Sequence, residues 1–300
     1  MLQMEIRDVE LIRKWRRAVD FLELTKPRVV LMILITTCIG FYIGSKETVD
    51  GIALLYTLMG TTLAAGGTLA LNQYMEREAD ACMKRTRFRP LPDGRIQPVE
   101  ALAFGVAITL GGLLYLALLT NLLSALITGI IVISYLFLYT PLKKKTSLCS
   151  IVGAVPGALP PVVGWTAARG ELGVGAWILF AILFLWQIPH SLAIAWLYRE
   201  DYTRAGMKLL PVISPDGKST GYQIINHCLA LLTVSLLPTL IGLAGSLYFF
   251  SALVLGILFL GYGLDLAVSR SLEAARRLLL ASVVYLPLQL GIWALDKKWF

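Results

Sequence analysis

The chain is built from long, nearly uncharged apolar runs of about 20 residues, joined by shorter polar segments. A run of that length crosses the hydrocarbon core of a bilayer as an α-helix, and the apolar residues do not alternate as they would in a membrane β-barrel. Hydrophobic residues make up 57% of the chain and charged residues only 15%, whereas soluble domains carry about 25% charged residues. The sequence therefore predicts an all-α, polytopic membrane protein.

We expect nine transmembrane helices around a central cavity, forming one domain over residues 29–300. The segment before them, residues 1–28, lacks the short apolar run and cleavage site of a signal peptide. Its apolar positions fit an amphipathic helix on the membrane surface, and a solvated tail is the alternative. The predicted transmembrane helices are Val29–Ser45, Ile52–Tyr74, Pro98–Leu118, Leu122–Thr140, Leu148–Ala168, Val174–Leu197, Tyr222–Leu243, Ser246–Val268 and Ala275–Leu295.

Lysine and arginine are distributed unevenly between the two sides of this predicted topology. The N-terminal segment and the connections after even-numbered helices contain 23 of them, while the other side contains only Lys46, Arg169, Lys297 and Lys298. Because basic loops stay in the cytoplasm, we expect an integral protein of the cell (inner) membrane with its N-terminus cytoplasmic and its C-terminus outside. This basic face accounts for the net charge of +8 without nucleic acid as a partner.

The connection after the second predicted helix begins with oxygen-bearing side chains four residues apart, in the segment "NQYMEREAD". On a helix, Asn72, Glu76 and Asp80 lie on one face at i, i+4 and i+8. Amide and carboxylate oxygens suit Mg²⁺, and phosphates and waters usually complete its coordination. Basic residues follow directly, so the predicted ligand is a Mg²⁺-diphosphate. The alternative is a solvated helix end in which Glu76 and Asp80 pair with Arg77 and Lys84.

A second polar connection, after the sixth predicted helix, lies on the same side of the membrane. It carries Glu200 and Asp201 beside Arg199, Arg204 and Lys208. The recurrence indicates a weak internal duplication in which two helix pairs each contribute half of one site. Inside the spans ionisable residues are nearly absent, unlike those of proton pumps and ion-coupled transporters. We therefore expect a site that opens to the inner face, with an apolar interior behind it.

Several segments between Leu24 and Pro211 together resemble the UbiA-type intramembrane prenyltransferases. They read "TKPR", "NQYMEREAD…MKRTRFRPLPDGR", "YTPLKKKTS", "GAVPGALPPVVGW" and "WQIPHSLAIAWLYREDYTRAG". The acidic segment is similar to the N-x-x-x-D-x-x-x-D motif of that family, with Glu76 in place of an Asp. Many relatives repeat D-x-x-x-D in the second loop, where this chain has Tyr198 and Tyr202. The combination resembles the branch that acts on heme rather than the branches that act on quinone precursors.

The resemblance implies Mg²⁺-dependent transfer of a farnesyl group from farnesyl diphosphate to a vinyl group of heme b, giving heme O. In this interpretation heme b and farnesyl diphosphate are substrates, and Mg²⁺ is the cofactor. Catalysis is expected at Asn72, Glu76, Asp80, Glu200 and Asp201, with Mg²⁺ held by all of these except Glu200. The residues expected to bind the substrates are Lys26, Arg28, Arg77, Lys84, Arg85, Arg89, Tyr139, Lys143, Lys144, His190, Tyr198, Arg199 and Tyr202.

The chain has two histidines, His190 and His227. An isolated histidine in a membrane helix is ordinarily a hydrogen-bonded packing residue, because a polar ring in the membrane needs a partner. Imidazole is also a common axial ligand of heme iron. The resemblance includes "WQIPH", so His190 is the expected heme contact, deeper in the membrane than the acidic loop.

Two other functions stay open at this point. One is a UbiA-type prenyltransferase acting on a quinone precursor, against which the second-loop tyrosines and "WQIPH" argue. The other is a transporter of an anionic lipid, against which the uncharged interior of the spans argues. The expected partners are the lipid bilayer and the two substrates, with a heme A synthase or oxidase assembly factors as candidate protein contacts.

Overall fold

The computed structural model describes residues 15–298, and these form a helical bundle with one isolated antiparallel bridge between Ala244 and Lys297. Within this part of the chain, nine helical segments are long and apolar enough to cross a membrane, as the sequence predicted. The helices are α2 Pro27–Gly44, α3 Gly51–Cys82, α4 Pro98–Leu119, α5 Leu122–Ile133, the π-helix η1 Ser134–Tyr139, α6 Thr140–Leu142, α7 Cys149–Ala158, α8 Pro160–Arg169, α9 Val174–Leu197, α10 Arg199–Arg204, α11 Leu210–Ile213, α12 Lys218–Ser235, α13 Leu237–Leu240, α14 Ser246–Ser269 and α15 Leu272–Leu295.

The second span is longer than its apolar run. It was predicted to end at Tyr74, but α3 continues to Cys82 as one 32-residue helix. The added residues are good helix formers, and several of them are buried by neighbouring segments, so the helix continues beyond the apolar stretch. The whole series from Asn72 to Asp80 therefore lies on a single rigid element.

Two other spans are broken at prolines. The fifth divides into α7 and α8 at Leu159, because Pro160 and Pro161 have no amide hydrogen to continue the helical ladder. The seventh divides into α12 and α13 just before Pro238 for the same reason.

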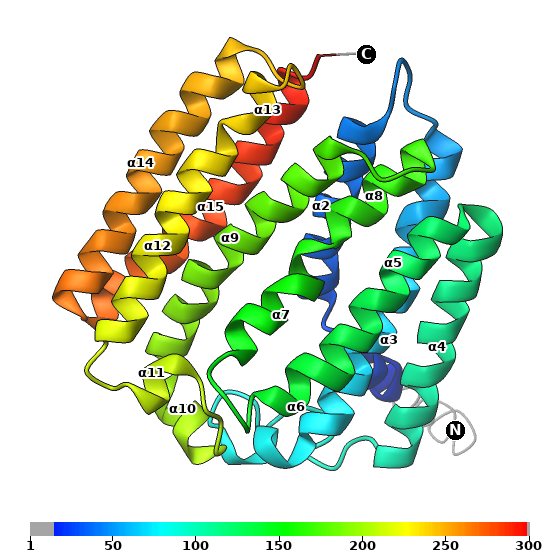
Figure 1. The fold of residues 1–300 in the computed structure, drawn as a ribbon. Coiled ribbons are helices and arrows are strands. Elements are labelled where there is room, and N and C mark those ends of the chain that lie inside the picture. The colour runs from blue at the N-terminus through cyan, green and yellow to red at the C-terminus, as the bar shows by residue number, and fades with distance from the viewer. Residues whose placement is uncertain (1–14, 299–300) are drawn as a thin grey trace, which may run out of the picture.

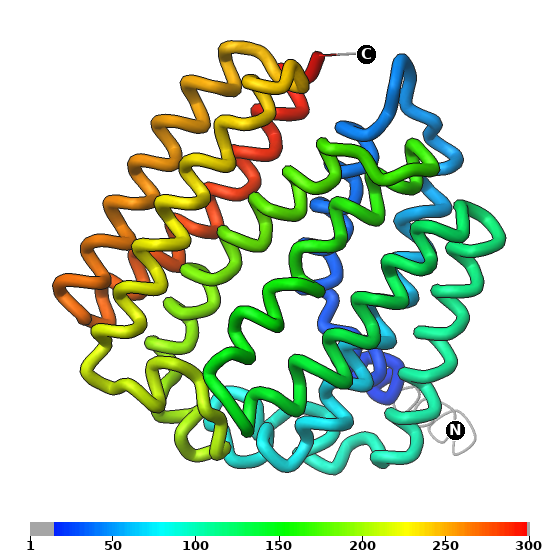
Figure 2. The backbone as a smooth tube through the Cα atoms, in the orientation of Figure 1, coloured from blue at the N-terminus to red at the C-terminus, as the bar shows by residue number. Residues whose placement is uncertain are grey.

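The helices run between two opposite ends of the molecule (Figure 1). The chain enters at the lower end in this view and leaves at the upper end, as an odd number of crossings requires. The tube in Figure 2 shows that the α3–α4 connection and the short helices α10 and α11 also lie at the lower end. The two polar connections expected to form the site therefore meet at the same end of the bundle.

Glycines allow very close helix contact where α2 crosses α8. A Cβ atom added to Gly40 would lie 2.0 Å from the Pro161 carbonyl oxygen, and one added to Gly164 would lie 1.9 Å from that of Thr37. Both distances are far inside van der Waals contact, so only glycine fits at these two positions. The contact fixes the N-terminal span against the broken fifth span, as small residues do in membrane bundles.

Residues 15–24 form a further helix before the first span. Its Trp15, Val19 and Leu22 side chains are exposed on one face, whereas Leu24 is buried. An ion pair joins Arg17 to Glu100 of α4. An exposed apolar stripe beside a membrane bundle supports the prediction of an interfacial segment, which stays a prediction.

Candidate active site

The side chains of Asn72, Glu76 and Asp80 are buried in the C-terminal part of α3. Their four-residue spacing keeps them on one side of the helix, as the sequence predicted. Burying two carboxylates near a membrane interior is costly unless each is paired or coordinated. The surrounding residues show how this cost is offset.

A different cation contacts each of these three side chains. Lys26 Nζ donates to Asn72 Oδ1 at 3.2 Å. Lys143 Nζ donates to Glu76 Oε1 at 2.8 Å, and Arg89 Nη1 donates to Asp80 Oδ2 at 2.7 Å.

The cations come from three separate segments: the residues before α2, the residues after α6 and the α3–α4 connection. The local alternative, pairing of Glu76 and Asp80 with Arg77 and Lys84, is wrong, because Arg77 pairs with Glu78 instead. The polar end of α3 is therefore a convergence point for distant parts of the chain. We call Asn72, Glu76, Asp80 and their three cations the inner site.

Lys26 reaches the inner site through an unusual backbone conformation. Its φ of 50° lies in the left-handed region, although the residue is not glycine and precedes Pro27. Burial, and then the charge of Arg89, lower the pKa of Lys26 to about 7. Lys26 is therefore a strained, weakly basic lysine beside Asn72. A nearby anion would favour its charged form.

The π-helix η1 positions the fourth span at the inner site. Both the amide and the hydroxyl of Thr140 bond to the Tyr135 carbonyl oxygen, five residues earlier, and this widens the helix. Thr140 Oγ1 in turn lies 3.1 Å from Asn72 Nδ2, which orients the amide so that its oxygen faces Lys26. Tyr139 then lies under Lys143, with the ammonium 4.4 Å from the ring centroid.

Thr140 and Tyr135 were not among the predicted site residues. The one local sequence signal for the π-helix was Pro141, directly after Thr140. A proline near the end of a span removes a backbone hydrogen-bond donor, so the regular α-helical pattern is interrupted there.

Lys143 stays charged despite its burial. Desolvation opposes the ammonium form, but the Tyr139 and Glu76 side chains together hold the pKa of Lys143 well above its ordinary value. Lys143 and Lys26 therefore differ in kind: the first is a permanent cation, and the second titrates near neutral pH.

Asp201 of the second loop does not join the carboxylates of α3. Its Oδ1 accepts from the Lys84 amide at 3.3 Å and from Arg204, so it clamps α10 to the residues after α3. Between residues 15 and 298, no three Asp, Glu, His or Cys side chains gather as a metal site. Mg²⁺ binding by Asp201 therefore stays a prediction, and Glu200 is solvent-exposed.

The remaining predicted substrate-binding residues divide into two groups. The guanidinium of Arg85 lies 4.9 Å from the ring centroid of Tyr198, and Arg199 packs in the same way on Trp196. The second group is exposed and has no described contact to the inner site: Arg28, Lys84 and Lys144.

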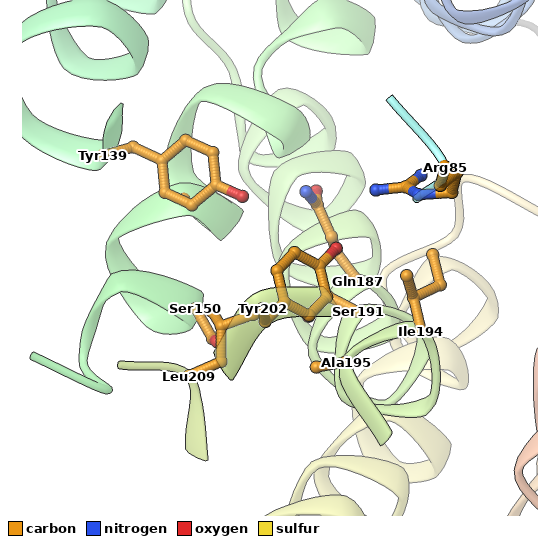
Figure 3. Close-up of a pocket in the computed structure, with 10 residues that line it drawn as sticks. Arg85, Tyr139, Ser150, Gln187, Ser191, Ile194, Ala195, Tyr202 and Leu209 are labelled. Atoms are coloured by element: carbon orange, nitrogen blue, oxygen red, sulfur yellow. The ribbon is translucent and has the colours of Figure 1, made fainter. Parts of the chain in front are cut away.

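A cavity of about 240 Å³ (Figure 3) is linked to the inner site by Tyr139, which lines the cavity and lies against the Lys143 ammonium. It is lined by Arg85, Tyr139, Ser150, Gly153, Gln187, Ser191, Ile194, Ala195, Tyr202 and Leu209. Gln187 and Ser191 were not among the predicted site residues. Polar residues within an apolar span are nevertheless a sequence signal for a buried functional site. This cavity is a small polar chamber at the end of the bundle that holds the inner site.

His190 is engaged inside the bundle and is not itself among the residues that line this cavity. Its Nδ1 lies 2.7 Å from Ser282 Oγ of α15, and its ring stacks on Trp186 at 4.7 Å between centroids. His227 Nδ1 lies 2.7 Å from the Gln223 carbonyl oxygen. The structure therefore describes a packing role for His190. Ligation of heme iron, which would use the other ring nitrogen Nε2, stays a prediction.

Comparison with known proteins identifies what this chain resembles. Residues 33–286 match the UbiA prenyltransferase family. The chain is 50% identical over 287 residues to a protoheme IX farnesyltransferase of Solibacter usitatus, covering 93% of this chain and 98% of that protein. A protoheme IX farnesyltransferase of Koribacter versatilis is 44% identical over 288 residues, covering 93% of both.

Solved structures share the fold at lower identity. A digeranylgeranylglyceryl phosphate synthase structure superposes with a TM-score of 0.77 at 22% identity, over 94% of this chain and 98% of that one. A UbiA homologue from Archaeoglobus fulgidus, bound to GPP and Mg²⁺, gives a TM-score of 0.60 at 18% identity, over 92% of this chain and 99% of that one.

Proposed function

The chain belongs to the UbiA prenyltransferase family, and we propose that it transfers the farnesyl group of farnesyl diphosphate to a vinyl group of heme b, giving heme O. The observation that carries the proposal is its near full-length similarity to protoheme IX farnesyltransferases, at 50% identity with that of Solibacter usitatus. The inner site supports it chemically, because a diphosphate needs several cations and hard oxygen ligands for its metal. The transporter and quinone-precursor alternatives have no comparable support.

The inner site fits Mg²⁺. Asp80 Oδ1 is buried without a hydrogen-bond partner among the described residues, as a carboxylate oxygen reserved for a cation would be. Asn72 and Glu76 add the amide and carboxylate oxygens that Mg²⁺ prefers. We infer that these three residues hold the ion, which when bound neutralises charge on the diphosphate oxygens.

The cations of the inner site have a direct role in the reaction. Cleavage of the C1–O bond of farnesyl diphosphate leaves the electron pair on the diphosphate and a cation on the allylic carbon. Lys26, Arg89 and Lys143 stabilise the leaving diphosphate, because fixed cations in a water-poor site act without reorganisation. The apolar bundle excludes water from the allylic cation and accommodates the prenyl chain.

The heme vinyl group supplies the electrons for the new bond. Its terminal carbon bonds to the farnesyl C1 atom, and positive charge moves to the carbon next to the porphyrin ring. A water molecule adds to that carbon and releases a proton, which leaves the hydroxyethyl farnesyl group of heme O. Heme b is thus consumed as a substrate.

We also infer the orientation in the membrane. The protein is an integral polytopic membrane protein with nine spans in its described part. The excess of basic residues at the end that holds the inner site supports a cytoplasmic N-terminus and an external C-terminus. Farnesyl diphosphate would then enter from the cytoplasm, and a contact with a heme A synthase stays a prediction.

The proposal is tested by incubating the purified protein with farnesyl diphosphate and MgCl₂, together with heme b or a hydroxybenzoate. Mass spectrometry should show heme b gaining a farnesyl group and a hydroxyl group, and the product should vanish with excess EDTA. A prenylated hydroxybenzoate in place of the heme product would support the quinone-precursor alternative. No product with either acceptor would remove the enzyme proposal.

A further inference from the structure

The small cavity beside the inner site gathers polar groups from four segments of the chain. In Figure 3 the Tyr139 hydroxyl, the Gln187 amide, the Arg85 guanidinium and the Tyr202 hydroxyl all point toward the same space. They come from η1, α9, the α3–α4 connection and α10. Polar groups that converge in this way on one space are typical of a binding site.

The Gln187 amide is the least expected of these groups. It lies in an apolar span, and no described residue forms a hydrogen bond with it. The neighbouring helix α7 makes room for it: a Cβ atom added to Gly157 would lie 2.0 Å from Gln187 Oε1 and 2.4 Å from Nε2. Gly157 thus leaves space for the Gln187 amide, which is half-buried and faces the cavity, so its hydrogen-bonding groups are available to a ligand there.

The chemistry of the lining selects an anionic oxygen ligand. Arg85, the two tyrosine hydroxyls and the amide NH₂ group are all donors, and none of the lining residues is acidic. The inner site is different, because there each cation already meets an oxygen side chain of α3. The cavity therefore favours a carboxylate that brings no metal of its own.

The size of the cavity indicates how much of a ligand it holds. At about 240 Å³ it is smaller than the roughly 300–1,000 Å³ of sites that enclose a whole small molecule. It accommodates one edge of a larger ligand. Heme b carries its two propionates on the half of the ring opposite its vinyl groups, so a propionate held here leaves the reacting edge free.

We propose that Gln187, together with Arg85 and Tyr202, binds a propionate carboxylate of the porphyrin acceptor and so orients its vinyl edge. This rests on the proposed function, since it assumes that heme b is the acceptor. The same oxygen chemistry also occurs in a diphosphate, so the experiment must separate the two sources.

The test compares heme b with its dimethyl ester, in which both carboxylates are masked. Gln187→Met removes the amide at nearly constant volume. It should lower kcat/KM for heme b about 10-fold to 100-fold, the range for a lost hydrogen bond to a charged group. It should leave kcat/KM for the dimethyl ester and the KM for farnesyl diphosphate unchanged. Gly157→Ala, which displaces the amide, should produce the same selective loss.

Gln223→Met makes the same chemical change on α12, outside the cavity lining. It should leave kcat/KM unchanged for both heme b and its dimethyl ester. Equal losses for heme b and its ester in Gln187→Met would overturn the proposal in favour of a packing role. A raised KM for farnesyl diphosphate alone would mean that the cavity holds the diphosphate instead.

Binding of heme b and its ester, followed by absorbance titration, keeps the proposal testable without turnover. If the wild-type protein binds heme b more tightly than the ester but forms no product, the proposed function fails while the carboxylate site stands.

Discussion

Lys143 Nζ lies 2.8 Å from Glu76 Oε1, although 67 positions separate the two residues in the chain. Both side chains are almost fully enclosed, with exposed fractions of 13% and 10%. The pair joins the end of the fourth span to the end of the second. Each residue neutralises the charge of the other inside a largely buried pair.

Removing one member of this pair should destabilise the protein. Lys143→Met leaves the Glu76 carboxylate buried without its cation, and we expect a loss of about 3–5 kcal/mol in the free energy of unfolding. Thermal unfolding in detergent measures this loss. The double variant Lys143→Met/Glu76→Gln should regain most of the stability but not the activity. A single variant as stable as the wild type would contradict the importance of the pair.

The binding of farnesyl diphosphate should weaken as pH rises above about 7, the lowered pKa of Lys26. Below that pH Lys26 is already charged. Above it the free protein holds a neutral lysine that must take up a proton when the anion binds, so affinity falls by up to about tenfold per pH unit. The dissociation constant of an unreactive farnesyl thiodiphosphate, measured from pH 6.5 to 9, reports this slope. Lys26→Met should bind more weakly and lose this part of the pH dependence, whereas an identical slope in that variant would assign it to another group.

Asp80→Asn should abolish most turnover while the fold is kept. The substitution removes the carboxylate with the unpaired buried oxygen, and roughly a 100-fold loss in kcat is expected for one electrostatic group of an active site. The Mg²⁺ concentration for half-maximal activity should also rise. Asp93→Asn, in the α3–α4 connection that follows, is exposed and paired with Arg95; it is the matched control and should be nearly neutral. Wild-type turnover in Asp80→Asn would exclude the proposed metal site.

Cysteine labelling should establish the orientation. In a Cys82→Ser background, which removes the one exposed native thiol among the described residues, Glu171→Cys should react with a membrane-impermeant maleimide added outside intact cells. Thr146→Cys should react only after the membrane is opened, because it follows the fourth span on the basic side. The reverse pattern would invert the proposed topology.

His190→Ala should lower stability more than it changes heme binding. The substitution deprives Ser282 and Trp186 of their contacts, and a buried group left without its partner costs about 1–3 kcal/mol. The melting temperature and the absorbance spectrum of bound heme should be measured together. An altered heme spectrum with unchanged melting would restore the role of His190 as an iron ligand.

The sequence by itself determined the properties that depend on neighbouring residues. Runs of apolar residues predicted the nine spans, because a bilayer of known thickness requires a helix of known length. Four-residue spacing predicted that Asn72, Glu76 and Asp80 share one face, because the pitch of the helix alone sets that relation. The family resemblance then predicted the chemistry of this face.

Only the tertiary structure decided which distant groups meet these residues. It brought Lys26, Arg89 and Lys143 to three different oxygens of α3, while the Asp201 carboxylate, at the same end of the bundle, became a clamp on Lys84 and Arg204. It also placed His190 against Ser282 and opened space for Gln187 beside Gly157. The physical reason is that these contacts depend on helix crossings, kinks and the π-helix, where a shift of one residue rotates a side chain by about 100°. Such rotations are set by packing across the whole bundle, and no local pattern in the chain records them.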